Sequence, residues 1–380
     1  MNDLEVRPVR TRADQKLFLY FPWDLYRNDP NWIPPLLQNQ TELLGFKRHP
    51  FYDDAEGQTF IALRKGKPVG RIQAVIHYPY LRRFKERRGY FGFFESIDDP
   101  TVSQGLFEAA RQWLAERDVF AMRGPINPSL NYECGLLVDG FDTPPTFMMT
   151  YNPPYYEQLI KAYGFEKVQD LFAFWGHTDM LTGLDKKLEF VVKEATRRFD
   201  VKLRPINKRN FLAEVKMFLD IYNQSLVGTW GFTPMSEGEI KHAAEGMQQL
   251  IVPEMTTVAE IDGRPVGVVF GLLDYNPRIK QINGRLFPFG FLRLLWNKKG
   301  IKKMRLISTN VVPEYQRWGL GVVLLSRLVP DILAWGIKET EFSWVLESNH
   351  LSFSTLKRGG AKLEKTFRIY DFGTATPYAE

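Results

Sequence analysis

The chain has little cysteine and little histidine, and both shortages limit its chemistry. Cys134 is the one cysteine in 380 residues, which excludes an intrachain disulfide and a cysteine-rich metal site. The five histidines include no pair at a spacing typical of metal ligands. We therefore expect a reducing compartment and no bound metal.

Long apolar runs are also missing. Nowhere do about eighteen uncharged apolar residues follow one another, as a membrane-spanning helix requires. Residues 1–10 alternate charged and small side chains and lack the apolar core of a secretory signal. We expect a cytoplasmic protein that is either soluble or peripheral at the inner membrane.

The charge balance suits an anionic partner. The formal net charge is +6, which fits the phosphates of coenzyme A, an acidic lipid headgroup or nucleic acid. The most basic segment, residues 81–88, is short, and the chain has neither zinc-finger spacing nor an RNP-like aromatic signature. We expect no nucleic-acid partner.

An internal repeat indicates the domain organisation. Residues 62–70 (ALRKGKPVG) match residues 259–267 (AEIDGRPVG), and both predict a β-hairpin with a glycine in its tight turn. At the same offset, Asn152 and the helix predicted after it match Asn349 and its helix. We therefore predict two tandem domains, residues 1–178 and 179–380. Each is expected to be α/β, with a mixed, mostly antiparallel sheet flanked by helices.

Hydrophobic periodicity gives the elements of the second domain. In chain order the pattern predicts helix 186–199, strand 201–205, helices 211–222 and 236–249, the hairpin, strand 304–312, helix 319–335, strand 341–345, helix 351–357 and a final strand 365–372.

A glycine-containing turn joins the predicted strand 304–312 to the helix after it. The turn reads Gln316-x-x-Gly319-x-Gly321, and Arg317 adds a cation. Glycines allow backbone N–H groups to point inward, and a helix N-terminus is electropositive. The pattern predicts a site for a pyrophosphate; the alternative is an ordinary strand-to-helix turn.

The order of hairpin, strand, glycine turn, helix, strand, Asn349-x-x-Ser352 and Gly360 resembles the acyl-CoA-binding core of the GCN5-related N-acetyltransferase (GNAT) superfamily. The resemblance covers residues 200–372 and implies acyl-CoA as co-substrate. It implies that these residues hold the pantetheine and the diphosphate: Val311, Val312, Gln316, Arg317, Trp318, Gly319, Leu320, Gly321, Asn349 and Ser352. Two aspartates stand in the matching turn of the first domain, at residues 98–99, so we expect a degenerate first copy and one CoA site per chain.

The resemblance further implies an N-acyltransferase in which an amine attacks the thioester directly. Such a reaction needs a base for the amine proton and, often, an acid for the thiolate. Glu347 is the leading candidate base, with Asn310 and Asp274 as alternatives. Leu356 stands where the superfamily commonly has tyrosine, so Tyr370 or Tyr315 would have to replace the acid; each also fits an ordinary packed aromatic.

Two basic, apolar segments bear on the acceptor. Residues 285–305 contain seven cations and no carboxylate, and residues 78–88 are a shorter counterpart. Both predict contact with an anionic membrane, or packing against the other domain. Tandem members of the superfamily include lipid N-acyltransferases of the bacterial ceramide synthase kind, which suggests a long-chain acyl group and a sphingoid or other lipid amine.

Two further functions stay open at this point. The chain could acetylate a small or protein amine, or it could bind acyl-CoA without catalysis. Tandem aminoacyl-tRNA-dependent transferases are a further comparison, but the glycine turn favours CoA. The proline-rich and polar segment 124–135 is expected to line a cleft.

Overall fold

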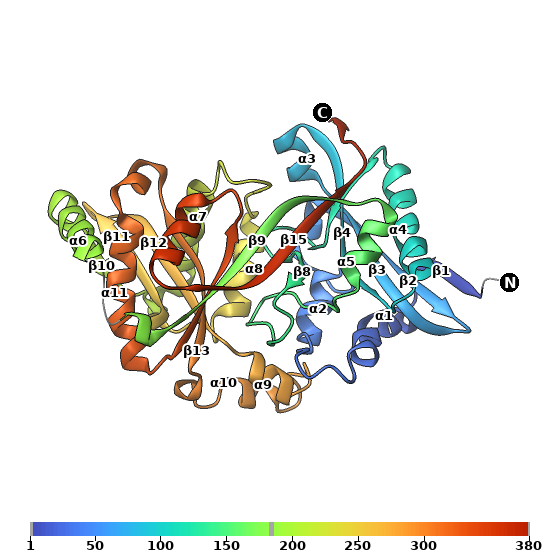
Figure 1. The fold of residues 1–380 in the computed structure, drawn as a ribbon, viewed down its shortest axis with the longest axis horizontal. Coiled ribbons are helices and arrows are strands. Elements are labelled where there is room, and N and C mark those ends of the chain that lie inside the picture. The colour runs from blue at the N-terminus through green and yellow to red at the C-terminus, as the bar shows by residue number, and fades with distance from the viewer. Residues whose placement is uncertain (1–2, 182–185, 379–380) are drawn as a thin grey trace. The chain divides into compact units, whose positions relative to one another are not determined.

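A computed structural model describes residues 3–181 and 186–378, which gather into two compact units (Figure 1). The first unit comprises the chain up to Leu171, then Asn276–Leu294 and the chain from Lys365 onward. The second comprises Phe172–Tyr275 and Leu295–Glu364. The chain therefore passes between the units more than once. The division into tandem copies at residues 178 and 179 is a statement about the repeat and stays a prediction.

The first unit is built on a twisted sheet whose strands are β1 (Leu4–Pro8), β2 (Ala55–Arg64), β3 (Lys67–His77), β4 (Glu86–Ser96), β5 (Ala121–Gly124) and β15 (Lys362–Phe372), in that spatial order. Its helices are α1 (Arg12–Leu25), α2 (Leu37–Leu43), α3 (Tyr78–Phe84), α4 (Pro100–Ala115), α5 (Tyr156–Tyr163) and α9 (Asn276–Gln281). Short strands β6 (Ile126–Asn127), β7 (Glu133–Cys134), β8 (Leu136–Asp139) and β16 (Thr376–Pro377) complete it.

The second unit contains the strand order β14 (Glu339–Leu346), β13 (Lys303–Val311), β12 (Arg264–Leu273), β11 (Thr256–Ile261) and β10 (Lys202–Arg204). The end of β9 (Glu166–His177) lies beside β14. Its helices are α6 (Lys186–Phe199), α7 (Phe211–Ser225), α8 (Glu237–Met247), α11 (Leu320–Trp335) and α12 (His350–Arg358), and α10 (Gly290–Leu295) ends at its border. The helices and strands predicted for residues 186–372 are confirmed, with shifted ends.

The two repeated hairpins have the same geometry. In each, the residue before the turn glycine also has a positive φ, 51° at both Lys65 and Asp262, which gives the tight turn expected of a two-residue hairpin. Both ladders also shift register at equivalent places, after Ala62 in β2 and after Ala259 in β11. The sequence repeat is thus a structural repeat, down to its β-bulge.

Helices cover both faces of the sheet in the second unit. On one face, Phe218 of α7 packs against Phe270 of β12, with ring centroids 5.2 Å apart. On the other, a Cβ built on Gly267 would lie 3.2 Å from Leu324 of α11. Because neighbouring residues of a strand point to opposite faces, Asn310 of β13 faces α7 and Thr309 faces α11.

The last long strand differs from its predicted place. Residues 365–372 were expected to complete the sheet of the second domain, but this part of β15 belongs to the first unit and pairs antiparallel with β5. Arg123 of β5 binds Asp371 of β15 through two parallel bonds of 2.7 and 2.8 Å. Arg88 adds a third contact to the same carboxylate, at 2.8 Å.

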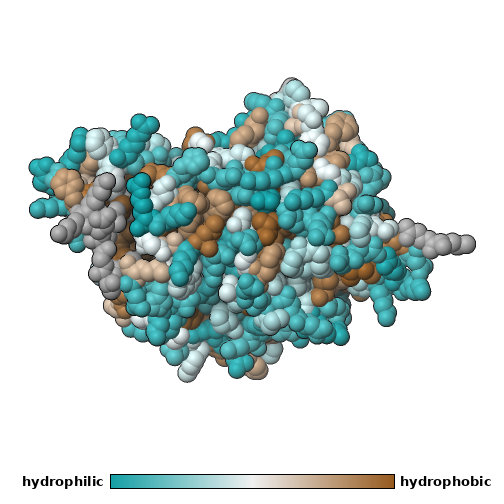
Figure 2. Space-filling view, in the orientation of Figure 1, coloured by the Kyte–Doolittle hydropathy of each residue, from teal (hydrophilic) through white to brown (hydrophobic). Residues whose placement is uncertain are grey.

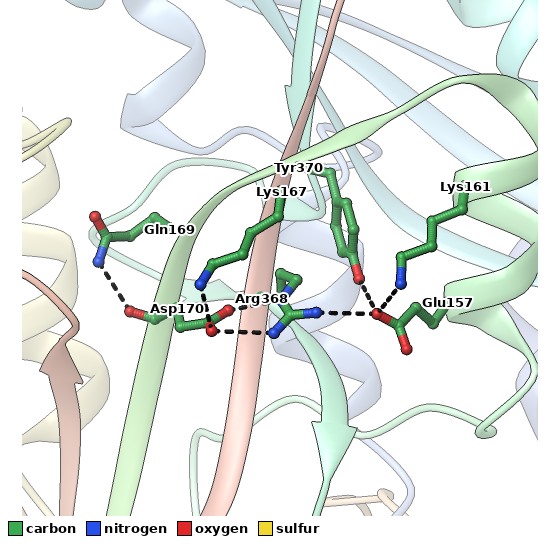
Figure 3. Close-up of polar contacts among 7 residues, drawn as sticks. All are labelled: Glu157, Lys161, Lys167, Gln169, Asp170, Arg368 and Tyr370. Carbon is green, nitrogen blue, oxygen red and sulfur yellow. Dashed lines mark hydrogen bonds and ion pairs between the residues drawn. The ribbon is translucent and has the colours of Figure 1, made fainter.

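A second ionic group holds β15 in the first unit (Figure 3). Arg368 donates to both oxygens of Asp170, at 2.7 and 3.0 Å, and to Glu157 at 3.1 Å. Lys167 and Lys161 complete the group at 2.8 Å from Asp170 and Glu157. Burial opposes ionisation of Asp170, but the bonds from Arg368 and Lys167 outweigh it and hold the pKa below its ordinary value.

Candidate functional site

The site begins where two parallel strands of the second unit separate. The ladder between β13 and β14 runs from Lys303 and Glu339 to Leu306 and Phe342. The later residues of both strands, 307–311 and 343–346, lie outside this ladder. Since parallel strands end at the same sheet edge, the turns after them meet at that edge. A fork of this kind can accept an extended ligand between its arms.

The predicted glycine turn lies directly after β13. Residues Pro313–Trp318 form a 3₁₀ helix, and Gly319, at φ 76°, begins α11. The side-chain nitrogen Nε2 of Gln316 donates to the backbone carbonyls of Val311 at 3.0 Å and Ser225 at 3.2 Å. These bonds tie the turn to the strand before it and to the end of α7.

Steric constraint applies to one of the two glycines and not to the other. A Cβ on Gly319 would lie 2.4 Å from Cγ1 of Val191, and its φ disfavours any L side chain. A Cβ on Gly321 would meet only Thr309, at an ordinary 3.5 Å. Gly321 can therefore be substituted without strain, which makes it the better position for a test.

The N-terminus of α11 has the electrostatics of an anion site. No side chain caps it, and its first turn contains no acidic residue. The first amides of a helix have no carbonyl partner within that helix, and the aligned peptide dipoles add positive potential. Arg317 and Gln316 are exposed beside it, whereas Leu320 is buried and anchors the helix.

Helix α6 packs against this turn, a contact that sequence reasoning missed. The guanidinium of Arg198 lies 3.9 Å from the ring centroid of Trp318. Phe199 packs edge-on against both Trp318 and Tyr315, at 5.7 and 5.4 Å. The predicted CoA contact Trp318 thus also anchors α6. An amphipathic pattern identified α6 but carried no signal for its neighbour.

Asn310 is buried at the fork, with 3% of its surface exposed. Its amide nitrogen donates to Oγ of Ser225 at 2.7 Å. Its side-chain oxygen, Oδ1, has no hydrogen-bond partner among the described residues. A buried acceptor without a partner is costly, so this atom is well placed to take an N–H from a ligand. An amide is not basic, and the geometry suits Asn310 as a hydrogen-bond acceptor better than as the base.

A buried ionic group lies at the base of the fork and was not predicted. Arg305 donates to Oγ of Ser343 at 2.8 Å, and this hydroxyl donates to Glu341 at 2.6 Å. Arg305 and Glu341 are also opposite one another in the ladder. Hydrogen bonds compensate the burial of these charges, so the group fixes the two strands where they begin to separate.

The predicted residues after β14 lie at the same sheet edge. Asn349 caps α12, because its side-chain oxygen accepts from the amide of Ser352 at 3.1 Å. Glu347 is half-buried just before this cap. The capping bond uses the oxygen of Asn349 and leaves its amide nitrogen as the group that can face a ligand.

Tyr370, a predicted candidate for the thiolate acid, lies on the part of β15 that belongs to the first unit, and its catalytic role stays a prediction. Its hydroxyl donates to Glu157 at 2.9 Å (Figure 3). Burial, and next the hydrogen bond to Glu157, raise the pKa of Tyr370 above its ordinary value.

Asp274, the other alternative base, is buried at the end of β12, and its amide bonds to the carbonyl of Lys303 at 2.9 Å.

The described residues offer neither a metal site nor a membrane-spanning helix. Among residues 3–181 and 186–378, no group of three or more His, Cys, Asp and Glu side chains could hold a metal ion. In the same ranges no helix has the length and apolarity needed to cross a membrane.

Relatives and solved structures agree with this architecture. The chain is 37% identical over 376 residues to the bacterial ceramide synthase of Caulobacter vibrioides, covering 97% of both chains. It is 36% identical over 375 residues to protein YghO of Escherichia coli K12, covering 96% of this chain and 94% of that protein. No protein-family model matches the chain.

Among solved structures, a tandem GNAT protein from the clavulanic acid pathway matches with a TM-score of 0.58 at 11% identity, covering 98% of this chain and all of that one. A GCN5-related N-acetyltransferase from Sphaerobacter thermophilus matches with a TM-score of 0.53 at 10% identity, covering 100% of this chain and 98% of that one. The tandem GNAT fold expected from the sequence is confirmed.

Proposed function

The chain belongs to the family of tandem GNAT-fold proteins that includes these relatives, and we propose that it is an acyl-CoA-dependent N-acyltransferase. The observation that carries the proposal is the uncapped N-terminus of α11, which begins on Gly319 directly beside the fork of β13 and β14. An uncapped helix N-terminus beside a strand fork supports a site for the diphosphate and the extended arm of acyl-CoA.

In this proposal acyl-CoA contacts the predicted site residues in a defined order. The amides from Gln316 to Gly321 would take the diphosphate, with Arg317 as an added cation. The pantetheine would run along Val311 and Val312 into the fork, where the free carbonyl of Asn310 accepts one of its N–H groups or that of the amine. Asn349 and Ser352 would face the arm from the other strand.

The proposed chemistry is a single acyl transfer. The amine nitrogen attacks the thioester carbonyl; the new C–N bond forms as the C–S bond breaks, and the thiolate leaves. Glu347 would accept the one proton that the amine loses, directly or through water, and that proton, or one from solvent, would then protonate the thiolate. Tyr370 and Tyr315 stay the candidates for the acid that protonates the thiolate.

For the two substrates, we propose a long-chain acyl-CoA as the donor and a lipid amine of the sphingoid type as the acceptor. The support is the name of the Caulobacter relative, which aligns over nearly the whole of both chains. Acetylation of a small or protein amine remains the alternative.

The test is a thiol-release assay with product detection by mass spectrometry. Palmitoyl-CoA and acetyl-CoA would each be combined with a long-chain amino diol, phosphatidylethanolamine, a polyamine and a lysine peptide. We expect thiol release and an amide product with palmitoyl-CoA and the amino diol. Release with acetyl-CoA and a polyamine alone would overturn the lipid acceptor, and binding without release would indicate a non-catalytic binder.

Gly321→Asp provides the matched inactive variant. It places a carboxylate at the diphosphate position without steric conflict, and an acidic residue in the first turn favours the helix. We expect kcat/KM to fall on the order of 100-fold, with Tm unchanged or raised. Gly321→Ala is the control and should stay near wild type. Equal activity of all three proteins would contradict the assignment of the site.

A further inference from the structure

Residues 285–293, called here the docking loop, carry the densest group of exposed apolar side chains among the described residues. Phe287 is 73% exposed, Phe289 72%, Leu292 54% and Phe291 40%. On the face drawn in Figure 2, hydrophobic residues occur in patches between hydrophilic ones. Scattered apolar residues are normal on a surface, whereas a cluster of this kind marks a contact site.

The base of the docking loop is held firmly in the first unit. Before the loop, Asn276 donates to the carbonyl of Pro145 at 2.7 Å, and Trp23 donates to Asn283, also at 2.7 Å. After it, Leu294 is buried, and its carbonyl accepts from Arg278 at 2.9 Å. In Figure 1 the loop follows α9, and its second half is the start of α10.

The loop itself has a defined turn. The amide of Phe291 bonds to the carbonyl of Leu286 at 2.9 Å. A Cβ on Gly290 would lie 2.0 Å from the carbonyl oxygen of Arg285, so only glycine fits this closure. The phenylalanines are therefore presented by an ordered loop on an anchored base.

The charges around the apolar tip are all of one sign along the chain. Arg285 and Arg293 bracket the tip and are exposed. No Asp or Glu occurs between Asp274 and Glu314. Aromatic residues rimmed by arginine suit the interface of an anionic bilayer, where rings enter the headgroup layer and cations meet lipid phosphate.

We propose that the docking loop inserts into the surface of an anionic phospholipid bilayer. A second copy of the chain is a poorer occupant, because two loops with the same arginine rims would repel each other. The proposal goes beyond the acyl-transfer function and does not depend on it, since vesicle binding requires neither acyl-CoA nor an amine.

The proposal is confined to this loop. In the other basic segment, residues 78–88, the structure buries Tyr80 and Leu81 and pairs Arg88 with Asp371. That segment offers few apolar side chains to a membrane, and its predicted contact has less support.

The experiment is co-sedimentation of the full-length protein with vesicles. Wild type should bind vesicles of phosphatidylcholine mixed with phosphatidylglycerol and bind pure phosphatidylcholine weakly. The double variant Phe287→Ser and Phe289→Ser should lose roughly tenfold in partitioning for each ring removed. Phe120→Ser, at a residue that is 51% exposed elsewhere in the first unit, is the control and should bind as wild type.

Charge is tested separately by Arg285→Gln with Arg293→Gln. This pair should weaken binding to the anionic vesicles by roughly tenfold and reduce its salt dependence. All changed residues are exposed, so Tm should stay within the range of wild type.

Each other outcome counts against the proposal. Unchanged vesicle binding by the phenylalanine variant would overturn it, and equal binding to neutral vesicles would overturn its electrostatic part. A dimer that the variant loses, without vesicle binding, would show that a second copy is the partner. Turnover of short-chain, water-soluble substrates should be unaffected in the variant, so failure of the acyl-transfer function and failure of the docking loop remain distinguishable.

Discussion

The two units contain the same fork, and their contents differ. In the first, β4 and β5 pair from Arg88 and Ala121 to Tyr90 and Arg123 and then separate, as β13 and β14 do in the second. Segment 126–127 fills the first fork: a Cβ on Gly92 would lie 1.9 Å from the carbonyl oxygen of Ile126. Asn127 accepts the amide of Phe93 at 2.6 Å. The fork of the second unit instead has the unpartnered carbonyl of Asn310.

The helices that follow the two forks differ in the same sense. Helix α4 is capped by Asp99, which accepts from the amide of Thr101 at 2.9 Å. The hydrogen bond from Arg64 lowers the pKa of Asp99 and keeps it ionised. Helix α11 begins on a glycine without such a cap. The first copy satisfies its helix N-terminus and its fork with its own residues. Among the described residues of the second copy, α11 has no side-chain cap and the fork keeps the unpartnered side-chain oxygen of Asn310.

The largest expected difference between the two forks comes from adding one methyl group to a glycine in each. Gly92→Ala forces a Cβ into the backbone at residue 126, so we expect a loss of at least about 3 kcal/mol in the free energy of unfolding. Gly321→Ala, where the contact is ordinary, should change it by less than about 1 kcal/mol. Denaturant unfolding measures both changes. Equal losses of unfolding free energy in the two variants would contradict the claim that the first fork is filled.

Asp371→Asn tests the strand that the first unit takes from the end of the chain. The change leaves Arg123 and Arg88, both largely buried, without their shared carboxylate. We expect a loss of about 3 kcal/mol in unfolding free energy. Asp24→Asn, which breaks the exposed pair with Arg27, is the control and should cost less than about 0.5 kcal/mol.

A buried histidine makes the first unit sensitive to mild acid. Burial lowers the pKa of His77 from its ordinary 6.5 to about 4; Asp54 opposes the shift and Arg82 adds to it. Between pH 6.5 and pH 4, His77 takes up a proton in the unfolded chain and not in the folded one. The contribution of His77 to the free energy of unfolding is therefore fully present above pH 6.5 and is lost as the pH falls toward 4. At about 1.4 kcal/mol per pKa unit, the loss is roughly 3 kcal/mol once both states are protonated.

The check is unfolding as a function of pH in wild type and His77→Phe, since the ring packs on Phe51 at 5.0 Å. The variant should lose this part of the pH dependence. A slope that is the same in both proteins would mean that His77 does not cause it.

The smallest effect is expected from Asp99→Ala. Loss of the cap should cost about 1 kcal/mol. It should create no second CoA site, because residues 126–127 still fill the fork. Appearance of a second site in this variant would show that the cap alone silences the first copy.

Much of the fold could be predicted because its signals are local. The hairpin turns at Gly66 and Gly263, the helix at 186–199 and the turn at Gly319 all follow from neighbouring residues. The placement of β15 could not be predicted: its pairing with β5 is between residues far apart in sequence, and an apolar strand fits either sheet.

The site was predictable in its turn and less so around it. Glycines, a following helix and a preceding strand identify residues 316–321, but nothing local indicates that α6 packs on Trp318 or that Asn310 is buried. Segment 124–135 was expected to line a cleft from its polar composition. The structure buries much of this segment and places Ile126 and Asn127 in the fork of the first unit, and its role in a cleft stays a prediction.

The most direct test of the account is isothermal titration of acyl-CoA into wild type and Gly321→Asp, in detergent that keeps a long-chain ligand monomeric. The account predicts one site per chain in wild type and affinity lower by about 100-fold in the variant, with folding intact. Two sites in wild type, or unchanged affinity in Gly321→Asp, would contradict the claim that only the second fork binds CoA.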